Sequence, residues 1–299
     1  MSPATKLRVL FIIGKGRSGS TLLGDLLGSY PGVFHLGEAW RLWSHGLLGP
    51  HSCSCGAAAP ECPVWGDILL RLRAGLSAWS VENPEEVVRL QRRLFGFGGV
   101  ARSFVAGTYR DDLARYRDLA ADLYRAAAET TGAGVLVDSS KWPLDPTLID
   151  PPEGLEPSAV HLVRHPSSVA ESWKKPKTFP DSETPMPRFG AVHTALSWTA
   201  RTWTAERVVA RLESRGTTLS FEDFLAEPAG AIAELATLVG EEWTLEGSGS
   251  VRLTPGHTIM GNPSRFRSGE VALRPAASPP RDPLVAALTW PWRRRFGYR

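Results

Sequence analysis

The sequence predicts an α/β fold in which helices flank a central parallel sheet. Short apolar runs alternate with helical patterns along the chain, and this alternation is typical of parallel sheets. The first run, residues 7–14 (LRVLFIIG), is continuous, rich in β-branched residues and ended by glycine, as expected of a strand buried on both faces. The composition, 42% hydrophobic and 22% charged, is that of a chain able to bury a full core.

Further strands and helices follow in order along the chain. Strands are expected at residues 134–137, 159–163 and 217–220. Helices are expected at residues 20–30, 85–94, 110–130, 167–173, 191–213 and 230–239. Proline-rich stretches at 143–157 and 176–187 are each followed by more of the same pattern, so we interpret them as long loops rather than linkers. The second, extended to 174–190, is a candidate lid. We therefore expect one domain over residues 1–299, with a core at about 7–267 and a tail, 268–299, that packs on it.

Charge and cysteine content limit the partners and the compartment. The 34 basic and 31 acidic residues leave a net charge of only +3, spread along the chain, so no nucleic-acid partner is expected. The longest apolar run near the amino end is residues 9–13, far short of the ~20 residues that span a bilayer, so no membrane insertion is expected. Three cysteines within ten residues favour a reducing, cytoplasmic compartment. The sequence does not define the oligomeric state.

A glycine-rich loop at residues 14–21 (GKGRSGST) lies between the first strand and the first helix. Backbone N–H groups and the positive end of a helix dipole converge on a phosphate at such a junction. The spacing matches the nucleotide-triphosphate loop G-x-x-x-x-G-K-[ST], except that Ser20 replaces the lysine and the cation is Arg17. This departure argues against a nucleotide-dependent kinase, which stays an alternative beside a non-catalytic nucleotide-binding protein.

Glu38 is the candidate general base. It follows a short strand-like piece at residues 34–37 and lies among apolar and aromatic neighbours. Such surroundings are expected to make a carboxyl group hold its proton more tightly than in water, which suits proton removal from a hydroxyl acceptor. His35 is the second candidate base and a candidate acceptor-binding residue, although the sequence favours a buried histidine bonded to the backbone.

Other polar residues follow the later strands. Lys141 ends the segment 137–141 (VDSSK) and could offset charge that develops in a transferred group, unless it is a solvated lysine. Arg164 ends the strand at 159–163, and Ser172 lies eight residues further on, about two helical turns away. These two could bind one phosphate if the loop folds the arginine back. Trp40, Trp43 and Trp142 are predicted to line the binding site of the acceptor, where aromatic rings suit a planar phenolic or a sugar molecule.

The segment Arg17-Ser18-Gly19-Ser20-Thr21 resembles the first loop, [KR]-S-G-[ST]-T, of the sulfotransferases that use 3′-phosphoadenosine 5′-phosphosulfate (PAPS). The resemblance is closest to bacterial small-molecule sulfotransferases and protein-tyrosine sulfotransferases, in which a Gly-Glu pair follows the loop as Gly37-Glu38 does here. It implies a single-domain, P-loop-like fold. It also implies transfer of a sulfuryl group from PAPS to a hydroxyl of a small-molecule acceptor, with PAP as product.

The resemblance assigns roles to residues of this chain. The loop 17–21 would bind the 5′-phosphosulfate, and Arg164 with Ser172 the 3′-phosphate. Glu38 would be the base, with Arg17 and Lys141 stabilising the transferring group. The segment 220–224 (SFEDF) resembles a Y-E-D-[LM] segment near the adenine, where Phe221 in place of tyrosine leaves only stacking. A late basic segment over the 3′-phosphate is matched by Arg265 and Arg267.

The three cysteines lie close together in the sequence. His51, Cys53, Cys55 and Cys62 offer four possible metal ligands within twelve residues, but their spacing is not that of a regular zinc motif. The sequence therefore favours thiols that pack a loop, or a small-loop disulfide, over a metal, and no metal site is expected.

Overall fold

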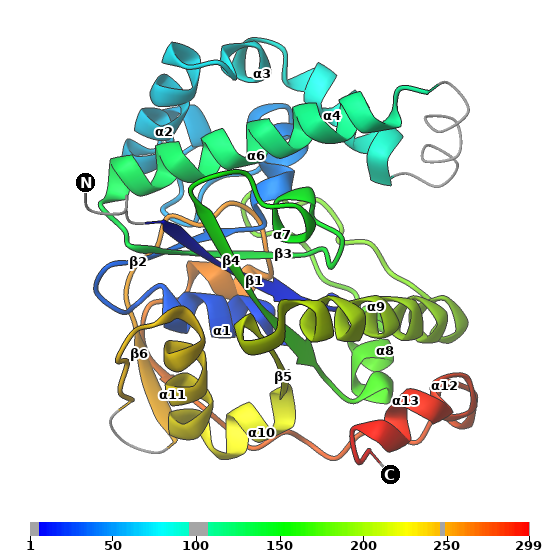
Figure 1. The fold of residues 1–299 in the computed structure, drawn as a ribbon. Helices are drawn as coiled ribbons and strands as arrows, with labels where there is room; N and C mark the ends of the chain where they lie inside the picture. Colours follow the sequence, from blue (N-terminus) through cyan, green and yellow to red (C-terminus); the bar gives the residue numbers. More distant parts are fainter. Residues whose placement is uncertain (1–5, 96–106, 246–248, 299) are drawn as a thin grey trace.

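A computed structural model describes residues 6–95, 107–245 and 249–298 (Figure 1). Its centre is a five-stranded sheet in the order β2-β3-β1-β4-β5, with every neighbouring pair parallel. The strands are β1 (Leu7–Ile13), β2 (Val33–Gly37), β3 (Val135–Lys141), β4 (Leu155–Val163) and β5 (Gly216–Ser220). The predicted parallel α/β fold is confirmed.

The helices fill the connections between these strands. In chain order they are α1 (Ser20–Leu27), α2 (Pro63–Ala74), α3 (Ala78–Glu82), α4 (Pro84–Phe95), α6 (Tyr109–Thr131), α7 (Pro146–Ile149), α8 (Pro166–Lys174), α9 (Ala191–Leu212), α10 (Phe221–Ala226), α11 (Pro228–Val239), α12 (Pro283–Leu288) and α13 (Trp290–Arg295). All six expected helices are present. Across the described ranges, no helix has both the length and the apolar character needed to cross a bilayer.

Several details differ from the sequence-based expectation, and helices such as α2 and α10 were not expected. Helix α1 ends at Leu27 rather than at residue 30, because the next backbone N–H groups, of Ser29 and Tyr30, bond three residues back in a tighter turn. Strand β3 continues through its polar end to Lys141. Residues 250–272, for which no strand was expected, contain an antiparallel hairpin of β6 (Ser250–Leu253) and β7 (Gly269–Ala272).

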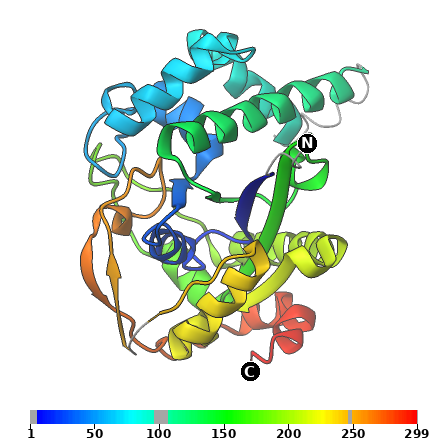
Figure 2. The same ribbon diagram turned by 60° about the vertical axis from the view of Figure 1, so that its left-hand side comes forward.

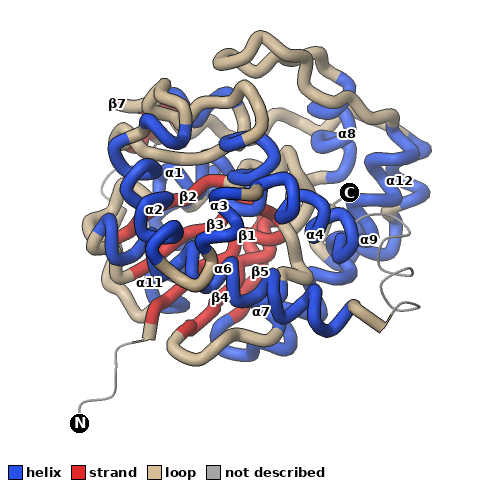
Figure 3. The backbone as a smooth tube through the Cα atoms, turned by 90° about the horizontal axis from the view of Figure 1, so that it is seen from above, coloured by secondary structure: helices blue, strands red, loops and turns tan. Residues whose placement is uncertain are grey.

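Both faces of the sheet are buried, as the continuous apolar run of β1 predicts. Val9, Phe11 and Ile13 pack with residues of α2, α6 and α9, whereas Leu10 and Ile12 pack with residues of α1, α10 and α11 and of the hairpin. Figures 2 and 3 show the helices on the two sides of the sheet. This alternation follows from the two-residue period of a strand.

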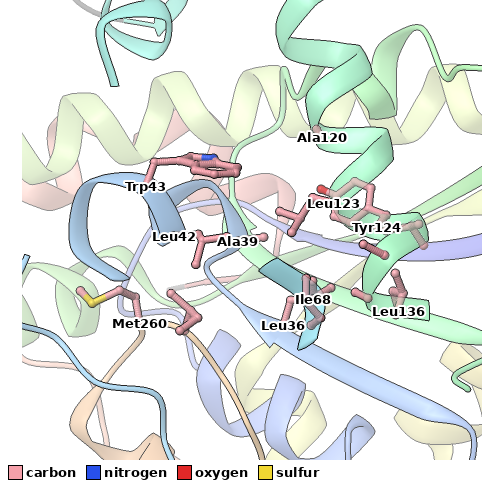
Figure 4. Packing of buried hydrophobic residues seen from close by; sticks show 14 of the residues in the cluster. Leu36, Ala39, Leu42, Trp43, Ile68, Ala120, Leu123, Tyr124, Leu136 and Met260 are labelled. Atoms are coloured by element: carbon pink, nitrogen blue, oxygen red, sulfur yellow. The ribbon is translucent and has the colours of Figure 1, made fainter. Parts of the chain in front are cut away.

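The polar end of β3 is held by helix α6. The hydroxyl of Tyr124 donates to Asp138 Oδ2 at 2.8 Å, and Asp138 Oδ1 accepts from the backbone N–H of Ser140 at 2.7 Å. Around them, Figure 4 shows Tyr124 and Leu123 packed with apolar residues that follow β2, including Leu42. This packing fixes the strand end that carries Lys141.

Candidate active site

The predicted site residues follow the carboxyl ends of the strands. The register places Ile13 opposite Lys141 and Val163 opposite Ser220. In an open parallel sheet, ligands bind along this edge. The fold therefore gathers the loop after β1, Glu38 after β2, Lys141 at the end of β3 and Arg164 after β4.

The glycine-rich loop connects β1 to α1, as predicted. Arg17 has a positive φ of 74°, and Gly19 has a φ of 96°. A Cβ atom on Gly19 would also collide with the ring of Phe221. Glycine at this position lets the loop turn tightly into the helix and lets the start of α10 lie directly against it.

A cavity of about 390 Å³ opens beside this loop, a volume that suits a small-molecule ligand. Six predicted site residues line it: Arg17, Ser20, Glu38, Trp40, Lys141 and Trp142. The two tryptophan rings are stacked, with centroids 6.3 Å apart. The structure therefore brings the catalytic candidates and an aromatic wall to one cavity.

Positive charge dominates this cavity. Among its described lining residues, one carboxylate, Glu38, faces five cations: Lys15, Arg17, Arg41, Lys141 and Arg201. Burial, and then the charge of Arg201, lowers the pKa of Lys15 to about 8. Cations crowded in this way, without matching carboxylates, favour an anionic ligand.

Several buried polar atoms near the loop lack a partner. Within the described part of the chain, Arg17 Nε, Ser18 Oγ and Arg164 Nε accept or donate no hydrogen bond. Burial, followed by repulsion from Arg17 and Arg164, lowers the pKa of Lys177 in the proline-rich loop. Unsatisfied buried donors are costly, so they indicate where the oxygen atoms of a ligand would bind.

Glu38 is paired with two cations. Its Oε1 accepts from Lys141 Nζ at 2.7 Å and its Oε2 accepts from Arg41 Nε at 2.8 Å. Burial alone would raise the pKa of Glu38, but Lys141 and Arg41 together lower it to about 2. The expectation that this carboxyl group holds its proton tightly is wrong, because it took account of the apolar neighbours in the sequence and not of the cations that the fold brings in.

Two predicted acceptor-binding residues lie away from the cavity lining. Trp43 is 2% exposed and packs in the core beside Leu42 (Figure 4). His35 is buried, with Nδ1 3.0 Å from Asp25 Oδ1 and Nε2 3.0 Å from Ser139 Oγ. Its partners are side chains rather than the expected backbone.

Arg164 and Phe221 lie together behind the loop. Arg164 Nη1 donates to the carbonyl oxygen of Arg17 at 3.1 Å, and its guanidinium lies 5.0 Å from the ring centroid of Phe221. Ser172 is half-buried in α8, next to Trp173, which lines the cavity. Neither Arg164 nor Ser172 belongs to the cavity lining.

The two late arginines have different environments. Arg265 is buried and donates to Asp181 Oδ2 at 2.7 Å, while its Nε and Nη1 have no partner within the described residues. Arg267 is exposed and, with Phe221 and Phe266, lines a second cavity. The structure thus separates these two arginines, which the sequence had grouped.

Several cavity residues were not predicted. Arg201 comes from the middle of α9 and its Nη1 donates to the carbonyl oxygen of Lys141 at 2.8 Å. Asn262 Oδ1 accepts a hydrogen bond from Arg17 Nη1. The candidate lid contributes Met186, whose sulfur lies 3.5 Å from Arg17 Nη2. For Asn262, its place just before the late arginines was a usable signal, whereas a lone arginine inside a helix gives none.

No protein-family model matches the chain, and no curated protein matches it. Among solved structures it is similar to a sulfotransferase domain from the Synechococcus PCC 7002 olefin synthase, with 19% identity and a TM-score of 0.47, over 100% of this chain and 98% of that one. It is also similar to a sulfotransferase domain from the curacin biosynthetic pathway, with 15% identity and a TM-score of 0.46, over 100% and 99%. At this level of similarity, the two structures identify neither a substrate nor a cofactor of this chain.

Proposed function

We propose that this chain is a PAPS-dependent sulfotransferase that transfers a sulfuryl group to a hydroxyl of a small-molecule acceptor and releases PAP. The observation that carries the proposal is the excess of cations around the cavity, combined with unpartnered donors on Arg17 and Arg164 within the described residues. A donor with several phosphate and sulfate groups would satisfy both. Ser20 at the usual lysine position of the loop makes a magnesium nucleotide the weaker alternative.

We assign residues of this chain to the parts of PAPS that they would bind. The loop 17–21 and Lys15 would bind the phosphosulfate end, at the start of α1. The 3′-phosphate would bind Arg164 and Ser172, with Arg265 and Arg267 as further cations, and Phe221 would contact the adenine. When bound, PAPS supplies a sulfuryl group already joined to a phosphate that leaves readily.

The catalytic residues of the chain would act on the acceptor. Glu38 is ionised at neutral pH and accepts the proton of the acceptor hydroxyl. At a pKa of about 2 it is a weak base, so its ion pairs with Lys141 and Arg41 must weaken before it can accept a proton. Lys141 Nζ can weaken its pair with Glu38 by turning one N–H toward an oxygen atom of bound PAPS. There its positive charge also offsets the negative charge of the transferring group. A phenolic or sugar ring would stack against Trp40 or Trp142 in this cavity.

The proposal is tested by ligand-dependent stability and by calorimetry. PAP should raise the melting temperature without added magnesium, because a ligand that binds only the native state stabilises it. Arg164→Ala should weaken PAP binding by roughly ten- to a hundredfold, because a charged hydrogen bond contributes about 1.5–3 kcal/mol. A magnesium-dependent shift with ATP and none with PAP would support the kinase instead.

A further inference from the structure

Four potential metal ligands meet outside the cavity. One ligand atom from each of Cys53, Cys55, Cys62 and His257 lies within 4.8 Å of all the others. Cys53 and Cys62 are buried, and all three cysteines are free thiols. His257 comes from a segment 195 residues after Cys62, so no local spacing in the sequence contained the fourth ligand.

The three distances among the ligand atoms of Cys53, Cys62 and His257 are close to the edges of a tetrahedral zinc site. Zinc–sulfur and zinc–nitrogen bonds of about 2.3 and 2.0–2.1 Å imply sulfur–sulfur edges of about 3.8 Å and sulfur–nitrogen edges of about 3.6 Å. The sulfur atoms of Cys53 and Cys62 are 3.6 Å apart, and they lie 3.8 and 3.2 Å from His257 Nδ1. A sulfur–sulfur bond would require about 2.05 Å.

We propose that Cys53, Cys55, Cys62 and His257 bind one zinc ion in a closed, structural Cys₃His site. Three thiolates and one neutral imidazole nitrogen would complete the tetrahedron, and each thiol would release its proton on binding. No electron transfer is involved. The proposal is independent of the sulfotransferase assignment, since it depends on none of the residues of the cavity.

The groups around the cluster orient its ligands. Cys62 lies immediately before the first residue of α2, Pro63. Trp65 Nε1 donates to the carbonyl oxygen of His257 at 2.6 Å. Hydrogen bonds of this kind hold metal ligands in place, and α2 thereby connects two of the four.

The cluster also holds the segment that supports the cavity. Beyond His257, Ile259 N–H donates to the carbonyl oxygen of Leu36, and its own carbonyl oxygen accepts from the N–H of Glu38, each at 2.8 Å. The segment then reaches Asn262, the partner of Arg17. A Cβ atom on Gly37 would collide with the backbone of Ile259, so this contact is very close. Zinc would thus fix the backbone that positions Glu38 and Asn262.

Metal analysis of the purified full-length protein tests the site directly. We expect about one zinc per chain by mass spectrometry of the metals, and the absorption of a tetrahedral cobalt–thiolate complex after reconstitution with Co²⁺. Cys55 is exposed, so Cys55→Ser should fold, shown by circular dichroism, and should weaken zinc binding by at least about tenfold. His257→Ala should behave alike.

A neighbouring variant serves as the control. Ser54→Ala removes hydrogen bonds between Ser54 and the backbone of Gly256 and Thr258, in the same loop, but keeps all four ligands. It should retain one zinc. The proposal is overturned if the wild-type protein binds neither zinc nor cobalt, if its intact mass reveals a disulfide, or if Cys55→Ser and His257→Ala keep wild-type affinity for zinc. Because the wild-type result alone can refute it, failure of a variant to fold leaves the test intact.

Discussion

Removing the charge of Lys141 should destabilise the fold, because it leaves the largely buried carboxylate of Glu38 with one cation fewer. The side chains of Lys141 and Glu38 are each 13% exposed and are joined at 2.7 Å. The pKa of Glu38 falls from 4.5 to about 2, which corresponds to at most about 3 kcal/mol of stability at neutral pH, because burial also lowers the pKa of Lys141 and this opposes part of the gain. Because the folded pKa is depressed, this stability is fully present above pH 4.5 and is lost as the pH falls toward 2. Lys141→Met, which leaves the carboxylate with Arg41 alone, should therefore cost about 3–5 kcal/mol at pH 7.

Urea unfolding at pH 7 and pH 4 measures this loss in wild type, Lys141→Met, Glu38→Gln and the double variant. The loss of stability in Lys141→Met should be smaller at pH 4. Without Lys141 the pKa of Glu38 is higher than in wild type, so its carboxyl group can take up a proton. The double variant should lose much less than the sum of the single losses, since neither charge is left buried and unpaired. Lys174→Met is the control, because the Lys174 side chain is 44% exposed in its pair with Asp282 and should lose less than about 1 kcal/mol. Equal losses in Lys141→Met and Lys174→Met, or strictly additive losses in the double variant, would refute the reasoning.

Two further predictions concern binding and turnover. Glu38→Gln should reduce turnover by ~10²–10⁴ with an ordinary phenol or alcohol, and an acidic nitrophenol should recover much of the loss. Its PAP affinity should equal or exceed that of wild type, because Lys141 is no longer paired with a carboxylate. A near wild-type rate in a sulfate-transfer assay would show that the base lies elsewhere. Lys15 has a pKa of about 8 without ligand, and a bound anion would raise this pKa. The affinity for PAP, measured by calorimetry, should therefore fall above pH 8 as Lys15 loses its proton, by up to about tenfold per pH unit. Lys15→Met should remove this dependence, and an unchanged pH profile in that variant would assign the effect to another group.

Most of the sheet could be predicted, because its signal is local. The apolar runs of β1, β4 and β5 predicted strands directly, and their order with the helices indicated a parallel sheet. Helix α2 was missed although Trp65, Ile68, Leu69 and Leu72 are buried at positions i, i+3, i+4 and i+7, the pattern of an amphipathic helix. The apolar strand signal of β3 covered only residues 134–137, and nothing local indicated that Tyr124 on a separate helix would bind Asp138 in its polar end.

The site was only partly predictable, because its electrostatics arise from tertiary contacts. The motifs predicted Arg17, Glu38 and Lys141, and all three line one cavity. Nothing local indicated that Arg201 of α9 would join them. The predicted direction of the Glu38 pKa shift failed for this reason: neighbours in sequence describe burial, whereas the charges that decide the shift come from other elements. The expectation of no metal site was based on local spacing, which could not include His257, 195 residues after Cys62.

The balance of charge in the cavity connects stability with ligand binding. Glu38 neutralises at most one of the five lining cations, and burial lowers the pKa of Lys15, Arg17 and Arg201. Each lowered pKa means that folding disfavours the charged form of that group, so the protein without ligand carries an electrostatic cost at neutral pH. A bound polyanion removes this cost and raises the same pKa values. Ligand binding should therefore be coupled both to proton uptake and to a loosened Lys141–Glu38 pair, which links donor binding to the basicity of Glu38.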